Sequence, residues 1–182
     1  MRASAITSTG TATAMFGRRW RANSDSAFSP VSNLSGANSD WVASVSADLG
    51  ASFGGALRLR LDDTTLAVNR LDATVHGKLG RVSAVARYFA LDQSLSSGAP
   101  TQEVAGTLGL KLTNKWDVSY GLRRDLDSDI NLSQNAHLTY RDNCTFLEFV
   151  YSRTETQDRS LGPSEGFQIR VGLSTLGVFG GS

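Results

Sequence analysis

Large apolar and polar side chains alternate through residues 142–182, the C-terminal part of the chain. One alternating run extends from Asn143 to Thr154, a polar stretch follows at residues 155–165, and a second run extends from Gly166 to Ser174. In the second run one face holds Phe167, Ile169, Val171 and Leu173, and the other holds Gln168, Arg170, Gly172 and Ser174. A period of two residues is typical of β-strands, so these residues predict a β-hairpin with one apolar and one polar face.

Short alternating runs recur along the rest of the chain, bounded by Gly, Asp, Asn and Ser. They predict ten antiparallel strands, at Thr11–Trp20, Asp40–Leu49, Ala56–Leu61, Thr65–Val75, Arg81–Leu91, Glu103–Leu112, Trp116–Arg124, Ile130–Arg141, Cys144–Thr154 and Gly166–Ser174. No apolar run approaches the roughly 18 to 20 residues of a membrane-spanning helix. The expected fold class is all-β, an antiparallel up-and-down meander in one domain of residues 1–182.

The long connections between these strands are not placed at random. Residues 21–39, 92–102 and 155–165 form the first, fifth and ninth connections, and they contain the three prolines, Pro30, Pro100 and Pro163. The even-numbered connections are all tight. Long loops on one rim and short turns on the other are typical of outer-membrane barrels, whereas a Greek-key sandwich has no reason to sort its loops in this way. We therefore expect part of a transmembrane β-barrel, as a curved open sheet or a small closed barrel.

Charged residues fall on the face opposite to the apolar rows. A Lys or Arg on the lipid side near the middle of a bilayer costs about 2–4 kcal/mol, so a barrel requires this separation. The fourth predicted strand is an exception, because Leu66 and Val68 differ in phase from Leu71, and a bulge near Asn69 and Arg70 would reconcile them. The charged residues expected to line the lumen are Arg58, Arg60, Arg87, Glu103, Lys111, Arg123 and Arg170.

Composition narrows the classes of function. Lys and Arg number 18 and Asp and Glu 17, so no basic surplus suggests a nucleic-acid partner. No spacing typical of a catalytic, nucleotide-binding or metal site is found, which predicts neither an enzyme nor a cofactor. We expect His76 in a turn and His137 on the lumenal face, both as isolated polar residues. The acidic stretches at 62–63 and 125–129 are expected to be solvated turns that bind cations weakly at most.

Two features of the strand ends bear on a membrane location. Trp20, Trp41, Trp116 and Tyr140 lie near strand ends, as in an interfacial aromatic girdle, although packing at a sheet edge would explain them equally well. The only cysteine, Cys144, follows a tight even-numbered turn. That turn would lie in the oxidising periplasm, where Cys144 has either a disulfide partner from outside this chain or none.

The C-terminal hairpin also resembles a known family. The order Tyr-Arg-Asp-Asn-Cys at residues 140–144, an aromatic strand ending in Tyr-Ser-Arg, a polar loop, and Gly-Phe-Gln-Ile-Arg-Val-Gly-Leu-Ser-Thr-Leu-Gly from residue 166 resemble the end of the lipopolysaccharide-assembly protein LptD, particularly its alphaproteobacterial members. The segments 27–30, 39–42 and 57–62 follow the usual order of the same family. The resemblance extends roughly from residue 11 to residue 180.

The resemblance implies a non-enzymatic function in the cell outer membrane. In that family the barrel holds the lipoprotein LptE, accepts lipopolysaccharide from an LptA-like periplasmic bridge and delivers it to the outer leaflet. The family ties a cysteine at the position of Cys144 to its N-terminal periplasmic segment, and often has a second cysteine where this chain has Asn143. Its signal for the barrel-assembly machinery matches Ser164, Gly166, Ile169 and Val171. The strand from Gly166 to Ser174 would be one edge of the family's lateral seam.

The first ten residues contain no continuous apolar region of the kind that signal peptides need. We therefore expect the chain to be the C-terminal strands of a longer barrel protein, whose signal peptide, periplasmic domain and earlier strands are missing. The alternative is a small outer-membrane channel or porin-like barrel with a misassigned start, since charged lumens occur there too. A water-soluble β-rich binding module is a third reading, which the sorting of the loops disfavours.

Overall fold

The computed structural model describes residues 1–20, 38–92, 101–155, 162–173 and 177–179. The strands are β1 (Arg2–Thr7), β2 (Gly10–Gly17), β3 (Trp41–Leu49), β4 (Phe53–Leu61), β5 (Val68–Leu79), β6 (Val82–Leu91), β7 (Thr101–Lys111), β8 (Trp116–Asp125), β9 (Ile130–Arg141), β10 (Thr145–Thr154), β11 (Ser164–Leu173) and β12 (Gly177–Phe179). None of the described residues is helical. Consistent with this, the described part contains no helix that is long and apolar enough to span a membrane.

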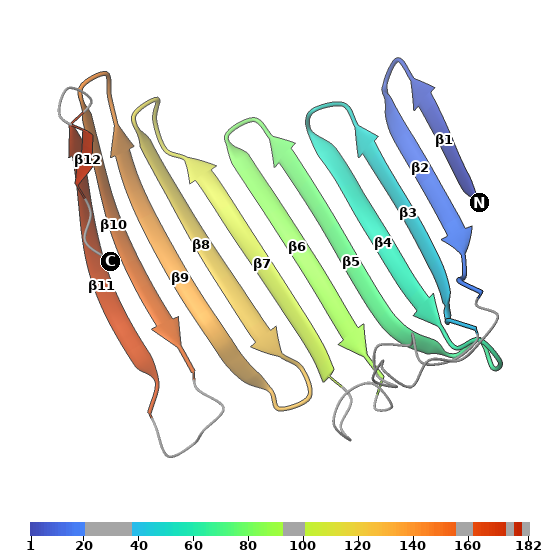
Figure 1. Ribbon diagram of the computed structural model, residues 1–182. Coiled ribbons are helices and arrows are strands. Elements are labelled where there is room, and N and C mark those ends of the chain that lie inside the picture. Colours follow the sequence, from blue (N-terminus) through green and yellow to red (C-terminus); the bar gives the residue numbers. More distant parts are fainter. Residues whose placement is uncertain (21–37, 93–100, 156–161, 174–176, 180–182) are drawn as a thin grey trace. The chain divides into compact units, whose positions relative to one another are not determined.

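Each strand pairs with the next one in sequence, from β1 to β12 (Figure 1). The all-β, antiparallel up-and-down meander expected from the sequence is therefore confirmed. Over the described residues the strand order is linear, with β1 and β12 at its ends, and is not closed into a barrel. All ten predicted strands are present, and β1 and the three-residue β12 are additional.

The chain forms two compact units. Unit 1 comprises residues 1–76 and 87–103, and unit 2 comprises residues 77–86 and 104–182, so the boundary passes through β5, β6 and β7. The short turns lie at the upper ends of the strands in Figure 1. In each unit the long connections join the other ends of the strands; they are residues 18–40, 92–100 and 155–163. The sorting of connections expected from the sequence is present within each unit.

The register in unit 2 shows why one face is apolar. Val118 of β8 is opposite Leu138 of β9, Leu138 is opposite Phe149 of β10, and Phe149 is opposite Ile169 of β11. The neighbouring residues on these strands point to the other face, because side chains alternate along a strand. The cross-strand rows therefore keep apolar side chains on one face over four strands.

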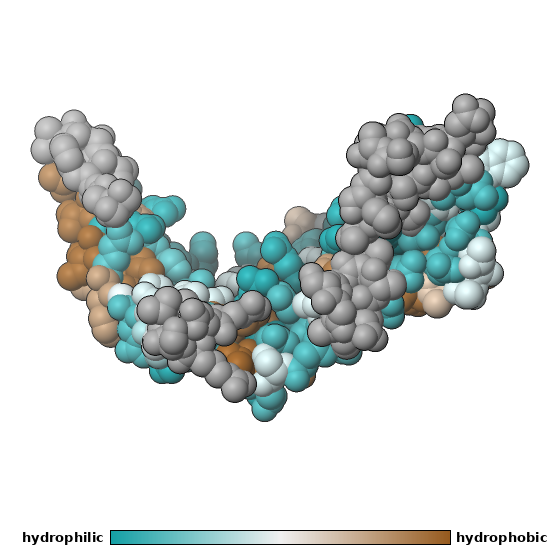
Figure 2. Space-filling view, turned by 60° about the horizontal axis from the view of Figure 1, so that its bottom comes forward, coloured by the Kyte–Doolittle hydropathy of each residue, from teal (hydrophilic) through white to brown (hydrophobic). Residues whose placement is uncertain are grey.

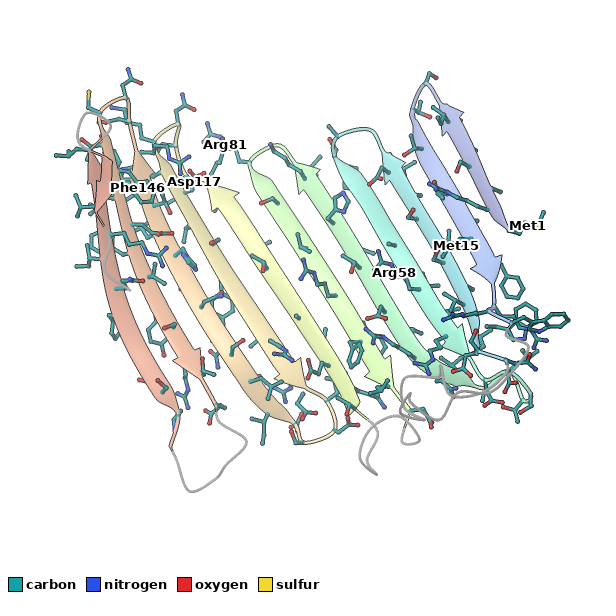
Figure 3. All side chains as sticks on the ribbon, viewed as in Figure 1. Met1, Met15, Arg58, Arg81, Asp117 and Phe146 are labelled. Carbon is teal, nitrogen blue, oxygen red and sulfur yellow. The ribbon has the colours of Figure 1, made fainter. Side chains whose placement is uncertain are left out.

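Unit 1 is built in the same way. Ala14 of β2 is opposite Val45 of β3, which is opposite Leu57 of β4, whereas Ser44 on the other face is opposite Arg58. Arg58 projects from the middle of β4 and is labelled in Figure 3. The side chains on the apolar face of β1 and β2 are smaller, since Ala3 and Ala5 are opposite Ala14 and Ala12.

The irregular phase of the fourth predicted strand has a structural explanation. Leu66 lies outside β5, in a turn, with a left-handed φ of 59°, so the expected strand start at Thr65 is wrong. Asn69 contacts Asp40 on the polar side of unit 1, and His76 lies over Gly54 on the same side. Asn69 and His76 are seven positions apart, an odd offset that would put them on opposite faces of a regular strand, so β5 changes phase once between them, as the bulge expected near Asn69 and Arg70 would require.

Aspartates close two of the turns. Asp62 Oδ1 accepts hydrogen bonds from the backbone N–H groups and the hydroxyls of both Thr64 and Thr65, at 2.7–3.0 Å. The bond from the Thr65 N–H is the largest of the effects that hold the pKa of Asp62 far below its ordinary value. In the short turn between β9 and β10 of unit 2, Asp142 accepts the N–H groups of Cys144 and Thr145, which likewise lowers its pKa.

The distribution of buried residues is inverted relative to that of a water-soluble domain. No hydrophobic residue among those described is buried, whereas the two buried polar residues are Asp40 and Asn69, exposed by 7% and 9%. Phe167 is 83% exposed and Ile169 63%. At the left of Figure 2, where β10 and β11 lie, hydrophobic residues occupy one side and hydrophilic residues the other. Each unit is thus a single layer whose apolar face is uncovered.

Candidate functional site

The apolar face of unit 2 is bounded by aromatic pairs. At the short-turn end Trp116 is opposite Tyr140, with ring centroids 5.0 Å apart, and the Tyr140 hydroxyl donates to Asp142. Toward the long-loop end Tyr151 is opposite Phe167, also at 5.0 Å. Tyrosine and tryptophan suit such positions because one end of the side chain is apolar and the other polar.

Among the described residues, the polar side chains on this face lie beyond the aromatic pairs, toward the ends of the strands. Gln134 accepts a hydrogen bond from the Tyr120 hydroxyl, and Arg153 forms an ion pair with Glu165 at 3.1 Å. From Tyr140 to Gln134 the chain advances about 20 Å along β9. Strands β3 to β11 have 9 to 12 residues, compared with about 9 to 11 for a tilted membrane-spanning strand. The strand lengths therefore match those of membrane-spanning strands.

In unit 1 two aromatic rings and an arginine meet at the long-loop end. Phe16 stacks on Trp41 with centroids 4.8 Å apart and planes inclined by 10°. The Arg18 guanidinium lies 4.8 Å from the centre of the Trp41 ring and 5.5 Å from that of Trp20. The structure thus places Trp20, Trp41, Trp116 and Tyr140 in ring contacts at the ends of the apolar face, where the sequence had left a girdle and edge packing both open.

The polar face of unit 2 carries an ion cluster across three strands. Glu148 of β10 accepts from Arg170 Nη1 of β11 at 3.0 Å through one carboxylate oxygen, and its other oxygen lies 3.0 Å from Nδ1 of His137 on β9. Arg170 Nη2 also donates to Gln168 at 3.0 Å. The Glu148 side chain is only 13% exposed. The expectation that His137 is an isolated polar residue is therefore wrong, because its cross-strand neighbour supplies a carboxylate.

A second cluster links β4 and β5 to the residue before β3 at the long-loop end of unit 1. Asp40 Oδ2 accepts from Arg60 Nε at 2.7 Å and from the Asn69 amide at 2.9 Å. Carboxylate oxygens of Asp40, Asp62 and Asp63 lie within 4.8 Å of one another, a spacing compatible with a cation. However, Asp62 already accepts four hydrogen bonds and Asp40 already pairs with Arg60, so both act within the fold. His76 belongs to β5 and not to a turn, which corrects the sequence expectation.

The charged residues expected in the lumen lie in both units. Unit 1 holds Arg58, Arg60, Arg87 and Glu103, and unit 2 holds Lys111, Arg123 and Arg170. Arg58 and Arg87 are exposed, whereas Arg60 and Arg170 belong to the two ion clusters. The acidic partners Asp40 and Glu148 were missed from the sequence, since only the paired strands show that Glu148 is opposite Arg170 and that Asp40 lies within hydrogen-bonding distance of Arg60.

The remaining predicted site residues all lie in unit 2, in β11 or in the turn before β10. Cys144 is exposed in the short turn between β9 and β10. Ser164, Gly166, Ile169 and Val171 all belong to β11, with the two apolar side chains exposed on the uncovered face and Gly166 on the opposite one. Gly166 is opposite Ser152, whose hydroxyl would lie 3.4 Å from a Cβ at that position.

Comparison with known proteins adds no relative. The chain matches no protein-family model, and no curated protein is significantly similar to it.

The ion cluster on Glu148 should hold β11 against its neighbours. We expect Glu148→Gln to lower the free energy of unfolding by about 1 kcal/mol, because two charge-assisted contacts are weakened at a partly exposed site. Denaturant unfolding in detergent micelles measures this change, and hydrogen exchange of the β11 amides shows where it acts. Glu148→Gln combined with Arg170→Gln should cost less than the sum of the two single changes.

Asp117→Asn is the matched control. Asp117 of β8 lies on the same polar face as Glu148, and this substitution also removes one carboxylate charge. Its effect should stay within about 0.5 kcal/mol. Strictly additive costs for Glu148 and Arg170 would show that the cluster does not couple β10 to β11.

Proposed function

We propose that this chain forms membrane-spanning strands of the barrel that inserts lipopolysaccharide into the outer leaflet of an outer membrane. The observation that supports the proposal most directly is the uncovered apolar face. Large hydrophobic side chains such as Leu57, Phe149 and Ile169 are 39%, 39% and 63% exposed, and none of the described residues forms an apolar core. Such a face needs an apolar environment, since contiguous exposed apolar patches of this kind are rare on water-soluble monomers.

A lipid bilayer fits this face better than a second protein layer. The strand lengths match the thickness of a bilayer, the aromatic pairs lie at the ends of the apolar band, and charged groups on that face appear only beyond them. Backbone groups in a membrane must be paired within the protein, and a meander does this along every internal strand. The long connections share one end in each unit, as the outer loops of such barrels do.

The assignment to lipopolysaccharide transport is supported by the resemblance to the LptD family. The position of Cys144 agrees with it, because an exposed thiol at the short-turn end can be reached by a cysteine from a periplasmic segment. Exposed guanidinium groups such as those of Arg58 and Arg87 suit phosphates on a sugar headgroup. On this proposal the partners are lipopolysaccharide, LptE, an LptA-like bridge protein and the barrel-assembly machinery, and the location is the outer membrane.

The second candidate is a small channel or porin-like barrel. The same uncovered apolar face and strand lengths favour it. A channel of this kind does not need to contact lipopolysaccharide on its polar face. It also does not need an exposed cysteine at the short-turn end.

A charge on each face of one strand tests the membrane assignment. We expect Leu138→Arg to destabilise the chain in phosphatidylcholine vesicles by about 2–4 kcal/mol, because the guanidinium would enter the lipid near the middle of the band. The matched control is Thr139→Arg, which places the same charge on the polar face opposite Asp117 and Glu148 and should cost far less. Denaturant unfolding from the vesicles measures both, and equal costs would contradict the membrane assignment.

A photo-crosslinker on the polar face distinguishes transport from a channel. We expect p-benzoylphenylalanine in place of Val150, which lies between His137 and Gln168, to form adducts with lipopolysaccharide after irradiation in vesicles. The same group in place of Phe149 faces the lipid and should also capture phospholipid. Immunoblotting for lipopolysaccharide reads the result. A Val150 position that captures none would reject the transport proposal and leave the channel.

Labelling from outside intact cells tests the orientation. We expect Cys144 to react with a membrane-impermeant maleimide only after the outer membrane is permeabilised and disulfides are reduced, since the short turns would face the periplasm. As a control, Ser128→Cys in the turn between β8 and β9, on a background in which Cys144 is replaced by Ser, should react in intact cells. The reverse pattern would overturn the proposed orientation.

A further inference from the structure

Four side chains form a compact group where β2 ends and β3 begins in unit 1. Phe16 and Trp41 stack on each other, and Arg18 lies over the rings of Trp41 and Trp20. We call these four residues the Arg18 cluster. Trp41 shares the apolar face with Ala43 and Val45, whereas Trp20 is 74% exposed. The cluster therefore borders the apolar face at its long-loop end.

The guanidinium of Arg18 lies over two indole rings and is a planar group that carries five N–H donors. Among the described residues no carboxylate pairs with Arg18, and the buried Asp40 beside Trp41 is already held by Arg60 and Asn69. A charged group with several N–H donors and no acid beside it in the described part of the chain is suited to an external anion.

The position selects the kind of anion. On the proposed function the apolar face lies in a bilayer, so a group at the long-loop end of that face lies at the level of the lipid headgroups. We propose that Arg18, held against Trp41 and Trp20, binds the phosphate of a lipid headgroup in the leaflet on the long-loop side. The rings contact the upper part of the acyl region, and the forked donors of Arg18 receive the phosphate oxygens.

The short-turn end of unit 2 provides a comparison. There Lys115 Nζ lies 6.0 Å from the centre of the Tyr140 ring, beside Trp116. Lys115 places an ammonium group, which acts as a point charge, near one ring. Arg18 places a guanidinium over two indole rings. The Arg18 cluster is thus the more specific of the two arrangements for a phosphate, because arginine presents a fixed fork of donors.

Tryptophan fluorescence in vesicles can test the proposal with the full chain. The sequence has three tryptophans, so Trp20→Phe together with Trp116→Phe leaves Trp41 as the only reporter. The chain is placed in phosphatidylcholine vesicles that contain brominated phosphatidylglycerol or, at equal fraction, brominated phosphatidylcholine. We expect the anionic lipid to be enriched beside Trp41 by about fivefold, the effect of one arginine at a membrane surface.

Arg18→Gln should remove this preference, so that the two brominated lipids quench Trp41 equally. The matched control is Arg2→Gln, which removes the same charge near the same end of the strands, but from the opposite face, where Arg2 is opposite Met15. It should keep the preference. Arg18→Lys retains the charge without the fork and should keep part of the preference, which protects the test if Arg18→Gln fails to fold.

The outcomes separate this inference from the proposed function. Equal quenching by both lipids in the Trp41 reporter that retains Arg18, or a preference that survives Arg18→Gln, would overturn the Arg18 assignment alone. Loss of the preference on adding free inorganic phosphate would show that the cluster binds a soluble anion and would also overturn it. An absence of quenching by either lipid would show that the apolar face is outside the bilayer, and the proposed function would fail with it.

Discussion

The pairing of backbone groups between neighbouring strands is the interaction on which this structure depends. Each unit is one layer thick and the described residues bury no hydrophobic side chain, so burial between two layers cannot hold the fold together. The ladder of hydrogen bonds from β1 to β12 joins the strands instead, and side-chain rows such as Val118, Leu138, Phe149 and Ile169 pack along it. A single layer of this kind is stable only if something apolar covers one face. The stability of the fold therefore depends on the apolar environment that the proposed membrane location would supply.

Ion clusters add specificity to this ladder. Asp40, Arg60 and Asn69 join β4 and β5 to the residue before β3, and His137, Glu148 and Arg170 join β9, β10 and β11. Both lie on the polar side, where water or a polar ligand reduces the cost of burying charge. A register slip of one residue would move each charged side chain to the apolar face, so these contacts select one pairing among those that alternation alone allows.

The ends of the strands combine two kinds of contact. Aspartates 62 and 142 accept backbone N–H groups and tighten the turns, while aromatic rings such as those of Trp41, Trp116 and Tyr140 lie against cations or against each other. An aromatic ring beside a cation is well placed where an apolar layer meets water, because the ring faces the former and the charge faces the latter. The Arg18 cluster extends this arrangement by leaving hydrogen-bond donors available for a ligand.

Period-two alternation was sufficient to predict the ten main strands, the apolar and polar faces and the end at which the long connections lie, because each depends only on residues close in sequence. Alternation is weak in β1, where small residues dominate, and β12 is only three residues long, so both were missed. The sequence also identified Arg60, Arg170 and His137 as polar-face residues without their partners. Asp40 and Glu148 were found only in the tertiary structure, since cross-strand neighbours are set by register, which depends on turn geometry and on every pair along the ladder at once. The contact of Arg18 with Trp41 likewise joins residues more than twenty positions apart in sequence, and only folding brings these side chains together.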